Sequence, residues 1–265
     1  MNRKQNILRN ISTLTKFEPM SPKKIHYVNC LTKHNIMTEL IELVAQKNQF
    51  VIETKYDNVY GVPQLIQILF AHKLKLHIVL VETLYLPKSD SYLHNQIASL
   101  FSIILSPSNK IQSWNDIKTK LKLFLDFSIF KLDQIEKIDV VNIQHKFQEW
   151  FRKNFANIQL QHAPSDNWSL EDAIAFSFQQ YFNQYLSCSY QWNVGLFARF
   201  DTNCNEKLIK DRLVLNLLSD NRRRHNLTQY AVHECMAVNK IAAFLQNYWT
   251  RKHQENYLKK YYNNC

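Results

Sequence analysis

The chain has 265 residues, 46% of them apolar, and its 33 lysines and arginines against 22 acidic residues give a net charge of +11. That apolar content supports a sizeable core, and the basic surplus favours polyanionic partners unless it only reflects a lysine-rich proteome. Gly61 and Gly195 are the only glycines, which excludes the glycine-rich phosphate loops of P-loop and Rossmann enzymes.

The cysteines and the apolar runs indicate the compartment. The five cysteines are widely spaced with no CxxC pair, which excludes a zinc ribbon and a thioredoxin-type site and indicates reduced thiols. The N-terminus is basic and polar without an apolar signal segment, and no apolar run approaches the roughly 18 residues of a membrane span. We therefore expect an intracellular protein, cytoplasmic or nuclear, with no membrane partner.

The first third of the chain predicts an arm, a helix and several strands. Residues 1–24 are rich in Asn, Lys and Arg and predict a flexible basic arm before a single domain over 25–265. A short strand at 26–30 and a helix over 37–46 follow. Three apolar runs then predict strands at 50–54, 64–70 and 76–82. The loops between these runs are too short for helical crossovers, so we expect antiparallel pairing.

The middle of the chain alternates helices and strands. The pattern predicts a helix at 92–105, a strand at 110–114, a helix at 115–127 capped by Asn115, a strand at 137–143 and a helix ending at 155. Connections of this length favour parallel pairing with right-handed crossovers. We therefore expect an α/β fold whose mixed five-stranded sheet has three antiparallel strands followed by two parallel ones, with helices on its faces.

The last third of the chain is expected to be mainly helical. A break at 164–167 precedes a helix over 168–185, which Ser169 opens with an acidic first turn. Residues 186–204 are irregular, and 206–218 have a helical pattern. A long C-terminal helix is then predicted from about Leu227 to Tyr257, directly after a basic cluster formed by Arg222, Arg223 and Arg224.

Two short motifs at opposite ends of the domain point to a family. Phe-Val-Ile-Glu-Thr-Lys ends at Lys55, and Leu-Thr-Gln-Tyr-Ala-Val-His-Glu carries Tyr230 and Glu234 one helical turn apart. Together they resemble the first and last motifs of the 3′–5′ exonuclease superfamily with an RNase H-like fold, in its tyrosine-containing branch. Segments 168–175 and 189–192 resemble further pieces of the family pattern, so that the resemblance covers residues 26–250.

The resemblance implies a site built from four acids around two metal ions, but the residues differ here. Glu53 occupies the first acidic position and Lys55 the second, while Lys120 aligns with the middle acid and Glu234 with the last. Two acids are thus replaced by lysine, and the two that remain are glutamates where the family has aspartates. The metal site is therefore predicted to be degenerate, with Asp116 and Asp57 as the only nearby replacements.

The family topology predicts that Glu53, Lys55, Tyr230 and Glu234 converge in one shallow cleft. As catalytic remnants we assign Tyr230, Glu234 and Glu53, of which Glu53 and Glu234 are the candidate metal ligands. The replacing lysines are positioned to hold a backbone phosphate without cleaving it. The arginine cluster is either a second set of phosphate contacts or a solvated loop.

Three functions remain open from the sequence. The first is a pseudo-exonuclease that binds single-stranded nucleic acid, RNA or DNA, through Lys55, Lys120 and Arg222–Arg224, with no tightly bound cofactor. The second is a weak metal-dependent 3′–5′ exonuclease that uses Mg²⁺ or Mn²⁺ with Glu53, Glu234 and Tyr230. The third is a protein-interaction scaffold on the same fold, in which the positive charge has no role.

Overall fold

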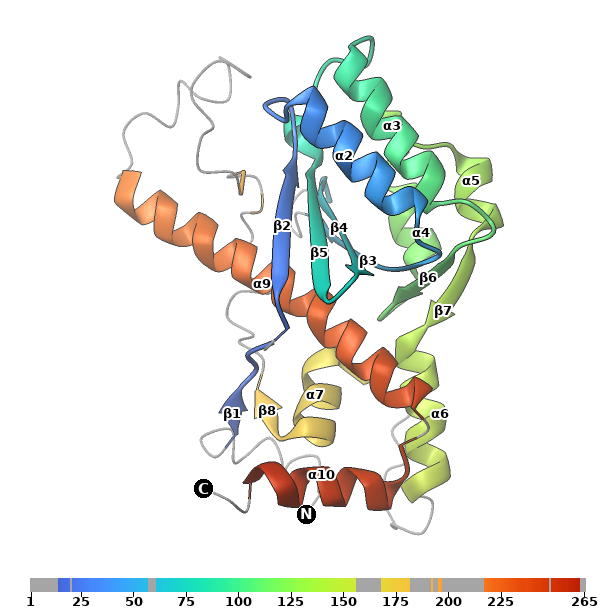
Figure 1. Cartoon of the computed structure of the whole chain (residues 1–265), viewed down its shortest axis with the longest axis vertical. Helices are drawn as coiled ribbons and strands as arrows, with labels where there is room; N and C mark the ends of the chain where they lie inside the picture. Colours follow the sequence, from blue (N-terminus) through green and yellow to red (C-terminus); the bar gives the residue numbers. More distant parts are fainter. Residues whose placement is uncertain are drawn as a thin grey trace.

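The chain forms a mixed α/β fold around one central sheet, seen in a computed structural model (Figure 1). The structure describes residues 14–19, 21–56, 61–155, 168–181, 192, 195–196, 217–247 and 249–262. The sheet has six strands in the order β2-β5-β4-β3-β6-β7. In chain order these strands are β2 (Lys23–Val28), β3 (Gln49–Tyr56), β4 (Pro63–His72), β5 (Lys75–Glu82), β6 (Lys110–Ser113) and β7 (Asp139–Asn142).

The strand pairing confirms the expected mixed topology and corrects the number of strands. β3, β4 and β5 pair antiparallel, and β6 and β7 extend the sheet in parallel from β3. The sixth strand is β2, which runs parallel to β5 along its whole length, from Lys23 beside Leu76 to Val28 beside Val81. The short strand expected at 26–30 is therefore a full edge strand that begins earlier, at Lys23.

Alternate residues of the central strands enter two separate cores, as the two-residue period of a strand requires. Phe50 and Ile52 of β3 pack into the core beneath the first four helices, whereas Val51 packs into the core beneath the later ones. The first four helices are α2 (His34–Ala45), α3 (Tyr92–Ile104), α4 (Ile117–Lys122) and α5 (Leu132–Lys137). The later helices are α6 (Ile143–Phe155), α7 (Leu170–Phe178) and α9 (Leu217–Gln246), which crosses the sheet (Figure 1).

The helix expected at 115–127 is shorter and begins with a different cap. α4 starts at Ile117, and the side chain of Asp116 accepts hydrogen bonds from the backbone N–H groups of Lys118 and Thr119. Asn115 and Asp116 are both good capping residues, and the structure uses the second. α4 ends at Lys122 and is followed by a single 3₁₀ turn, η3 (Leu125–Phe127).

The single long helix expected near the C-terminus is divided into two helices in the structure. α9 begins ten residues before the expected start, so Arg222–Arg224 lie within a helix and not in a loop. α10 (Arg251–Tyr262) follows after a break at Thr250. The break is stabilised because Thr250 and His253 exchange hydrogen bonds between backbone N–H groups and side chains, which is a helix N-cap arrangement.

The helix expected over 168–185 also ends early, because Gln179 adopts a left-handed conformation with φ of 51° that terminates α7. The chain then forms β8 (Gln180–Tyr181), which pairs in parallel with β1 (Thr15–Lys16) near the N-terminus. The helix expected over 206–218 and the irregular segment 186–204 lie almost entirely outside the described residues.

The boundary expected at residue 24 does not coincide with a structural boundary. Phe17 is buried in the core beneath α9, and β2 already begins at Lys23. The described part of the basic segment is thus attached to the domain by β1 and by a buried aromatic ring. No helix among the described residues is both long and apolar enough to cross a membrane.

Candidate functional site

The first motif on β3 and the last motif on α9 meet on one face of the sheet, as the family topology predicts. Lys55 Nζ donates a hydrogen bond of 2.6 Å to Glu234 Oε1, and both side chains are only 14% exposed. The same ammonium group lies 4.8 Å from the ring centre of Tyr230 and 5.7 Å from that of Trp192. A cation over aromatic faces is stabilised by the ring quadrupole, so these rings help to hold Lys55 in the site.

Glu53 is the buried centre of the site, with 3% of its surface exposed. Because β3 and β6 are parallel neighbours, Glu53 lies beside the end of β6. Its Oε1 accepts hydrogen bonds from the backbone N–H of Trp114 at 2.6 Å and from the Ser113 hydroxyl at 3.1 Å. Its Oε2 lies 3.6 Å from Nζ of Lys120, a residue of α4.

The two lysines and two glutamates therefore form two ion pairs that leave the cluster close to electrically neutral. Burial raises the pKa of Glu53, and the neighbouring Lys120 opposes this rise, while the carboxylate of Glu234 adds to it. Since removing an unpaired carboxylate from water is costly, the two ion pairs stabilise both glutamates in their buried positions.

A third acid belongs to the same environment and was not among the sequence candidates. Burial raises the pKa of Glu171, in the first turn of α7, and the negative charge of Glu234 contributes to the shift. From the sequence this residue was assigned only to the dipole of its helix. Its place in segment 168–175, which resembles a family element, was the signal that could have identified it.

The buried thiol beside the site is not a candidate nucleophile. Cys235 Sγ donates a 3.3 Å hydrogen bond to Gln67 Oε1 on β4. Burial raises the pKa of Cys235 well above its ordinary value, and nearby carboxylates reinforce this effect. Because only the thiolate reacts, this cysteine is chemically inert in the folded protein.

Donors of the chain itself occupy most carboxylate oxygens of Glu53 and Glu234. Both oxygens of Glu53 and one oxygen of Glu234 are already engaged by lysines and N–H or O–H donors. Glu234 Oε2 is buried without a hydrogen-bond partner, so one carboxylate oxygen remains to bind a metal. Within the described ranges, no three His, Cys, Asp or Glu side chains gather in a group that could hold a metal ion.

Of the two acids expected as replacement ligands, Asp116 and Asp57, the structure describes only Asp116. Asp116 is exposed, and both of its oxygens serve the start of α4, including a 2.5 Å hydrogen bond from the Thr119 hydroxyl. It acts as the N-cap of α4. Asp57 lies outside the described residues.

The two lysines that were expected to contact phosphate lie in ion pairs. Lys55 is paired with Glu234, and Lys120 with Glu53, so a phosphate could reach either ammonium group only by breaking an ion pair. Arg222 is exposed on α9, whereas Arg223 and Arg224 are partly buried. Arg222 lies about two helical turns before Tyr230, roughly 12 Å away along the helix axis. The exposed cation Arg222 thus lies beside the cluster of Glu53 and Glu234 and not inside it.

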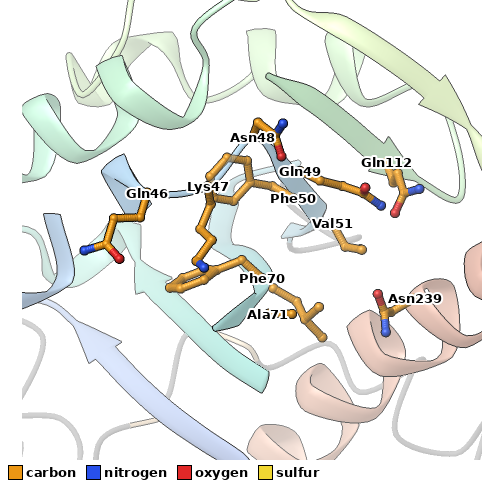
Figure 2. Close-up of a pocket in the computed structure, with 11 residues that line it drawn as sticks. Gln46, Lys47, Asn48, Gln49, Phe50, Val51, Phe70, Ala71, Gln112 and Asn239 are labelled. Carbon is orange, nitrogen blue, oxygen red and sulfur yellow. The ribbon is translucent and has the colours of Figure 1, made fainter. Parts of the chain in front are cut away.

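A separate cavity of about 340 Å³ lies at the start of β3, away from Glu53 and Lys55 near its end (Figure 2). Amide side chains surround it, including Gln112 from β6 and Asn239 from α9, which enter from different elements (Figure 2). The Oε1 atom of Gln112 is buried without a hydrogen-bond partner. None of the candidate site residues lines this cavity.

No model of a known protein family matches the chain, and no curated protein matches it in sequence. Among solved structures, Escherichia coli RNase D, an exoribonuclease involved in structured RNA processing, is 14% identical with a TM-score of 0.38, over 89% of this chain and 50% of that one. Trypanosoma brucei RNase D with GMP is 12% identical with a TM-score of 0.42, over 89% and 64%. The EXD2 exonuclease domain soaked in Mg is 13% identical with a TM-score of 0.38, over 89% and 94%.

The chain spans half the length of the E. coli RNase D chain and 64% of the T. brucei one. The six-stranded mixed sheet has helices on both faces, with α9 across it, and agrees with the α/β fold expected from the sequence.

Proposed function

We propose that this chain is a 3′–5′ exonuclease-like domain with a degenerate metal site that binds single-stranded nucleic acid. The observation that carries the proposal is the pair of ion pairs, Lys55 with Glu234 and Lys120 with Glu53, where β3 meets α4 and α9. An ammonium group is paired with each acid that would otherwise approach a metal.

The charge balance supports loss of the metal chemistry. Two-metal cleavage needs several carboxylates that hold two divalent cations about 4 Å apart. Here each remaining glutamate is neutralised by its own lysine at 2.6 and 3.6 Å. A divalent cation would have to displace an ammonium group from a partly buried carboxylate and would meet its repulsion at short range.

The surface charge supports a polyanionic partner. The net charge is +11, and Arg222 is an exposed cation on the helix that carries Tyr230 and Glu234. Phosphate contacts supply most of the affinity of non-specific nucleic-acid binding. RNA and DNA carry the same phosphate backbone, so this argument applies equally to both.

The first prediction tests degeneracy by cleavage. The full chain with Mg²⁺ or Mn²⁺ is expected to leave 5′-labelled single-stranded RNA and DNA oligonucleotides undegraded, because no pair of metal ions is held. The measurement is product length on a denaturing gel, with Glu234→Gln as the matched control. Metal-dependent shortening that Glu234→Gln abolishes would overturn the degenerate assignment and establish the weak exonuclease, which the convergence of Glu53, Tyr230 and Glu234 favours.

The second prediction tests binding through its salt dependence. The affinity of the full chain for a mixed-sequence single strand is expected to fall with salt at a log–log slope of about −3, the value for roughly four phosphate contacts. Fluorescence anisotropy of a labelled oligonucleotide between low and physiological salt gives this slope. Absence of binding at low salt, or binding that does not respond to salt, removes nucleic acid as the partner and leaves the interaction scaffold.

A further inference from the structure

A groove of about 480 Å³ runs between the N-terminal segment and the outer side of α9. Its lining includes Lys16 and Lys23 from the N-terminal segment and His225, Asn226, Gln229 and His233 from α9. The groove also contacts Tyr230, so it passes directly beside the acid cluster without containing Glu53 or Glu234. Its volume lies within the range of about 300–1,000 Å³ that is usual for ligand sites.

The polar residues of α9 in this groove form one continuous face of the helix. Positions 222, 226, 229 and 233 recur at intervals of three or four, and position 225 lies three residues after 222, which places all five on one side of the helix. The residues that pack on the sheet occupy the other side, including Ala231, Cys235 and Val238. Arg222 lies on the same side of α9, about one turn closer to the start of the helix than the residues that line the groove.

The charge in the groove is positive. Among the described residues that line the groove, Glu18 is the only acidic side chain, and it lies 3.6 Å from Lys16 in an exposed pair. Lys23 contributes a second ammonium group, and Arg222 stands at the end of the row on α9. Exposed ion pairs such as Lys16–Glu18 are weak, so Lys16 remains able to contact an anion.

The interior of the groove offers neutral hydrogen-bonding groups and an aromatic wall. Burial, together with Lys23 and Lys16, lowers the pKa of His233 to about 4, so its imidazole is neutral at physiological pH. The His233 ring packs edge-on against Phe17, with ring centres 5.9 Å apart. The amides of Asn226 and Gln229 line the same hollow, and each can both donate and accept a hydrogen bond.

We infer that this groove is the path of the bound strand: phosphates contact Lys16, Lys23 and Arg222, and unpaired base edges meet the amides of Asn226 and Gln229. This inference rests on the proposed function and adds to it where the strand lies. Cations with amide and imidazole groups between them suit a chain that alternates phosphates with bases. Base edges within a duplex are already paired, so the amides favour a single strand.

The path has a consequence for the role of the acid cluster. The strand runs along the outer side of α9, while Lys55 and Glu234 occupy its sheet-facing side, and Tyr230 is shared by both. The ion pairs then maintain the helix position that shapes the groove and do not themselves hold phosphate. Binding is therefore independent of divalent cations.

The test compares two double variants of the full chain that remove the same charge. Lys16→Ala/Lys23→Ala takes both lysines from the groove, whereas Lys33→Ala/Lys88→Ala takes two exposed lysines from the starts of α2 and α3, on the opposite face of the sheet. Anisotropy with a labelled single strand is measured across salt in the presence of EDTA. Loss of two phosphate contacts is expected to flatten the log–log slope by about 1.4, while the control variant keeps the slope of the unaltered chain.

A second measurement locates the strand without relying on substitutions. Photocrosslinking with an oligonucleotide that carries 5-iodouridine is expected to label the peptide spanning His225–His233, as mapped by mass spectrometry. If the unaltered chain binds but Lys16→Ala/Lys23→Ala behaves like the control and the crosslinks fall elsewhere, the groove assignment is overturned while the proposed function stands. If the unaltered chain does not bind at low salt, both are overturned.

Discussion

Replacing Lys120 by methionine is expected to lower the free energy of unfolding by about 3 kcal/mol at pH 7, because it leaves a buried carboxylate without its cation. Glu53 is 3% exposed and Lys120 lies 3.6 Å from it. The effect is placed at the lower end of the range for broken buried pairs, since the Trp114 N–H and the Ser113 hydroxyl still bind Glu53. Urea unfolding monitored by tryptophan fluorescence measures the loss.

The same helix provides the control. Lys122 pairs with Glu136 at 2.7 Å, but the two side chains are 44% and 52% exposed. Lys122→Met is therefore expected to change the stability by less than about 1 kcal/mol. Equal losses for the two variants would show that the Lys120 pair has no special role. In the double variant Glu53→Gln/Lys120→Met the buried charge is gone, and most of the lost stability should return.

The loss from Lys120→Met should also depend on pH. Burial raises the pKa of Glu53 above its ordinary value of 4.5, and Lys120 is the main group opposing this rise. Without Lys120 the pKa of Glu53 in the folded state rises further. At pH values between the unfolded-state pKa and this raised folded-state pKa, the folded protein binds more protons than the unfolded one. Stability then falls as pH rises through that window, and the loss is smaller at pH 5 than at pH 7.

Restoring acids at the two lysine positions is expected to create a site that needs a metal. In Lys55→Glu/Lys120→Asp, new carboxylates approach Glu234 and Glu53, and their mutual repulsion should lower the stability by on the order of 4 kcal/mol without divalent cations. A cation that binds only the folded state at a hundred times its Kd returns about 2.7 kcal/mol. Thermal unfolding in EDTA and in MnCl₂ measures both effects.

The matched control is the neutral pair Lys55→Gln/Lys120→Asn, which removes the ammonium groups without adding acids. Its melting temperature is expected to be the same in EDTA and in MnCl₂. If MnCl₂ stabilised the unaltered chain as strongly as the acidic variant, the lysines would not be what excludes the metal, and the degenerate assignment would be wrong.

Prediction of the helices and strands from the sequence was most accurate where the local residue pattern agrees with the environment of the element. The antiparallel strands β3, β4 and β5 follow from apolar runs with short loops, and α3 from regular helical spacing. The convergence of Lys55, Tyr230 and Glu234 could be predicted only from the order of the family motifs, because no local pattern brings together residues so far apart.

The errors occurred where tertiary contacts decide between similar local choices. Asn115 and Asp116 are equivalent caps by propensity, and the break before α10 carries no glycine or proline to mark it. The break coincides instead with Trp249, whose ring packs 5.0 Å from that of Phe244 and whose carbonyl accepts a hydrogen bond from the Trp150 indole. Lys55 and Lys120 were expected to face a ligand, and the sequence could not show that each would face an acid of its own chain.

The ion pair between β3 and α9 has a consequence for how the chain is made, because its partners are 179 residues apart. At a synthesis rate of about 5–20 residues per second, α9 leaves the ribosome roughly 10–35 s after β3. During that interval the apolar face of Val51, Leu65 and Leu69 lacks α9 as its cover, and Glu53 and Lys55 lack their final surroundings. This face of the sheet can therefore complete its packing only after α9 has been synthesised.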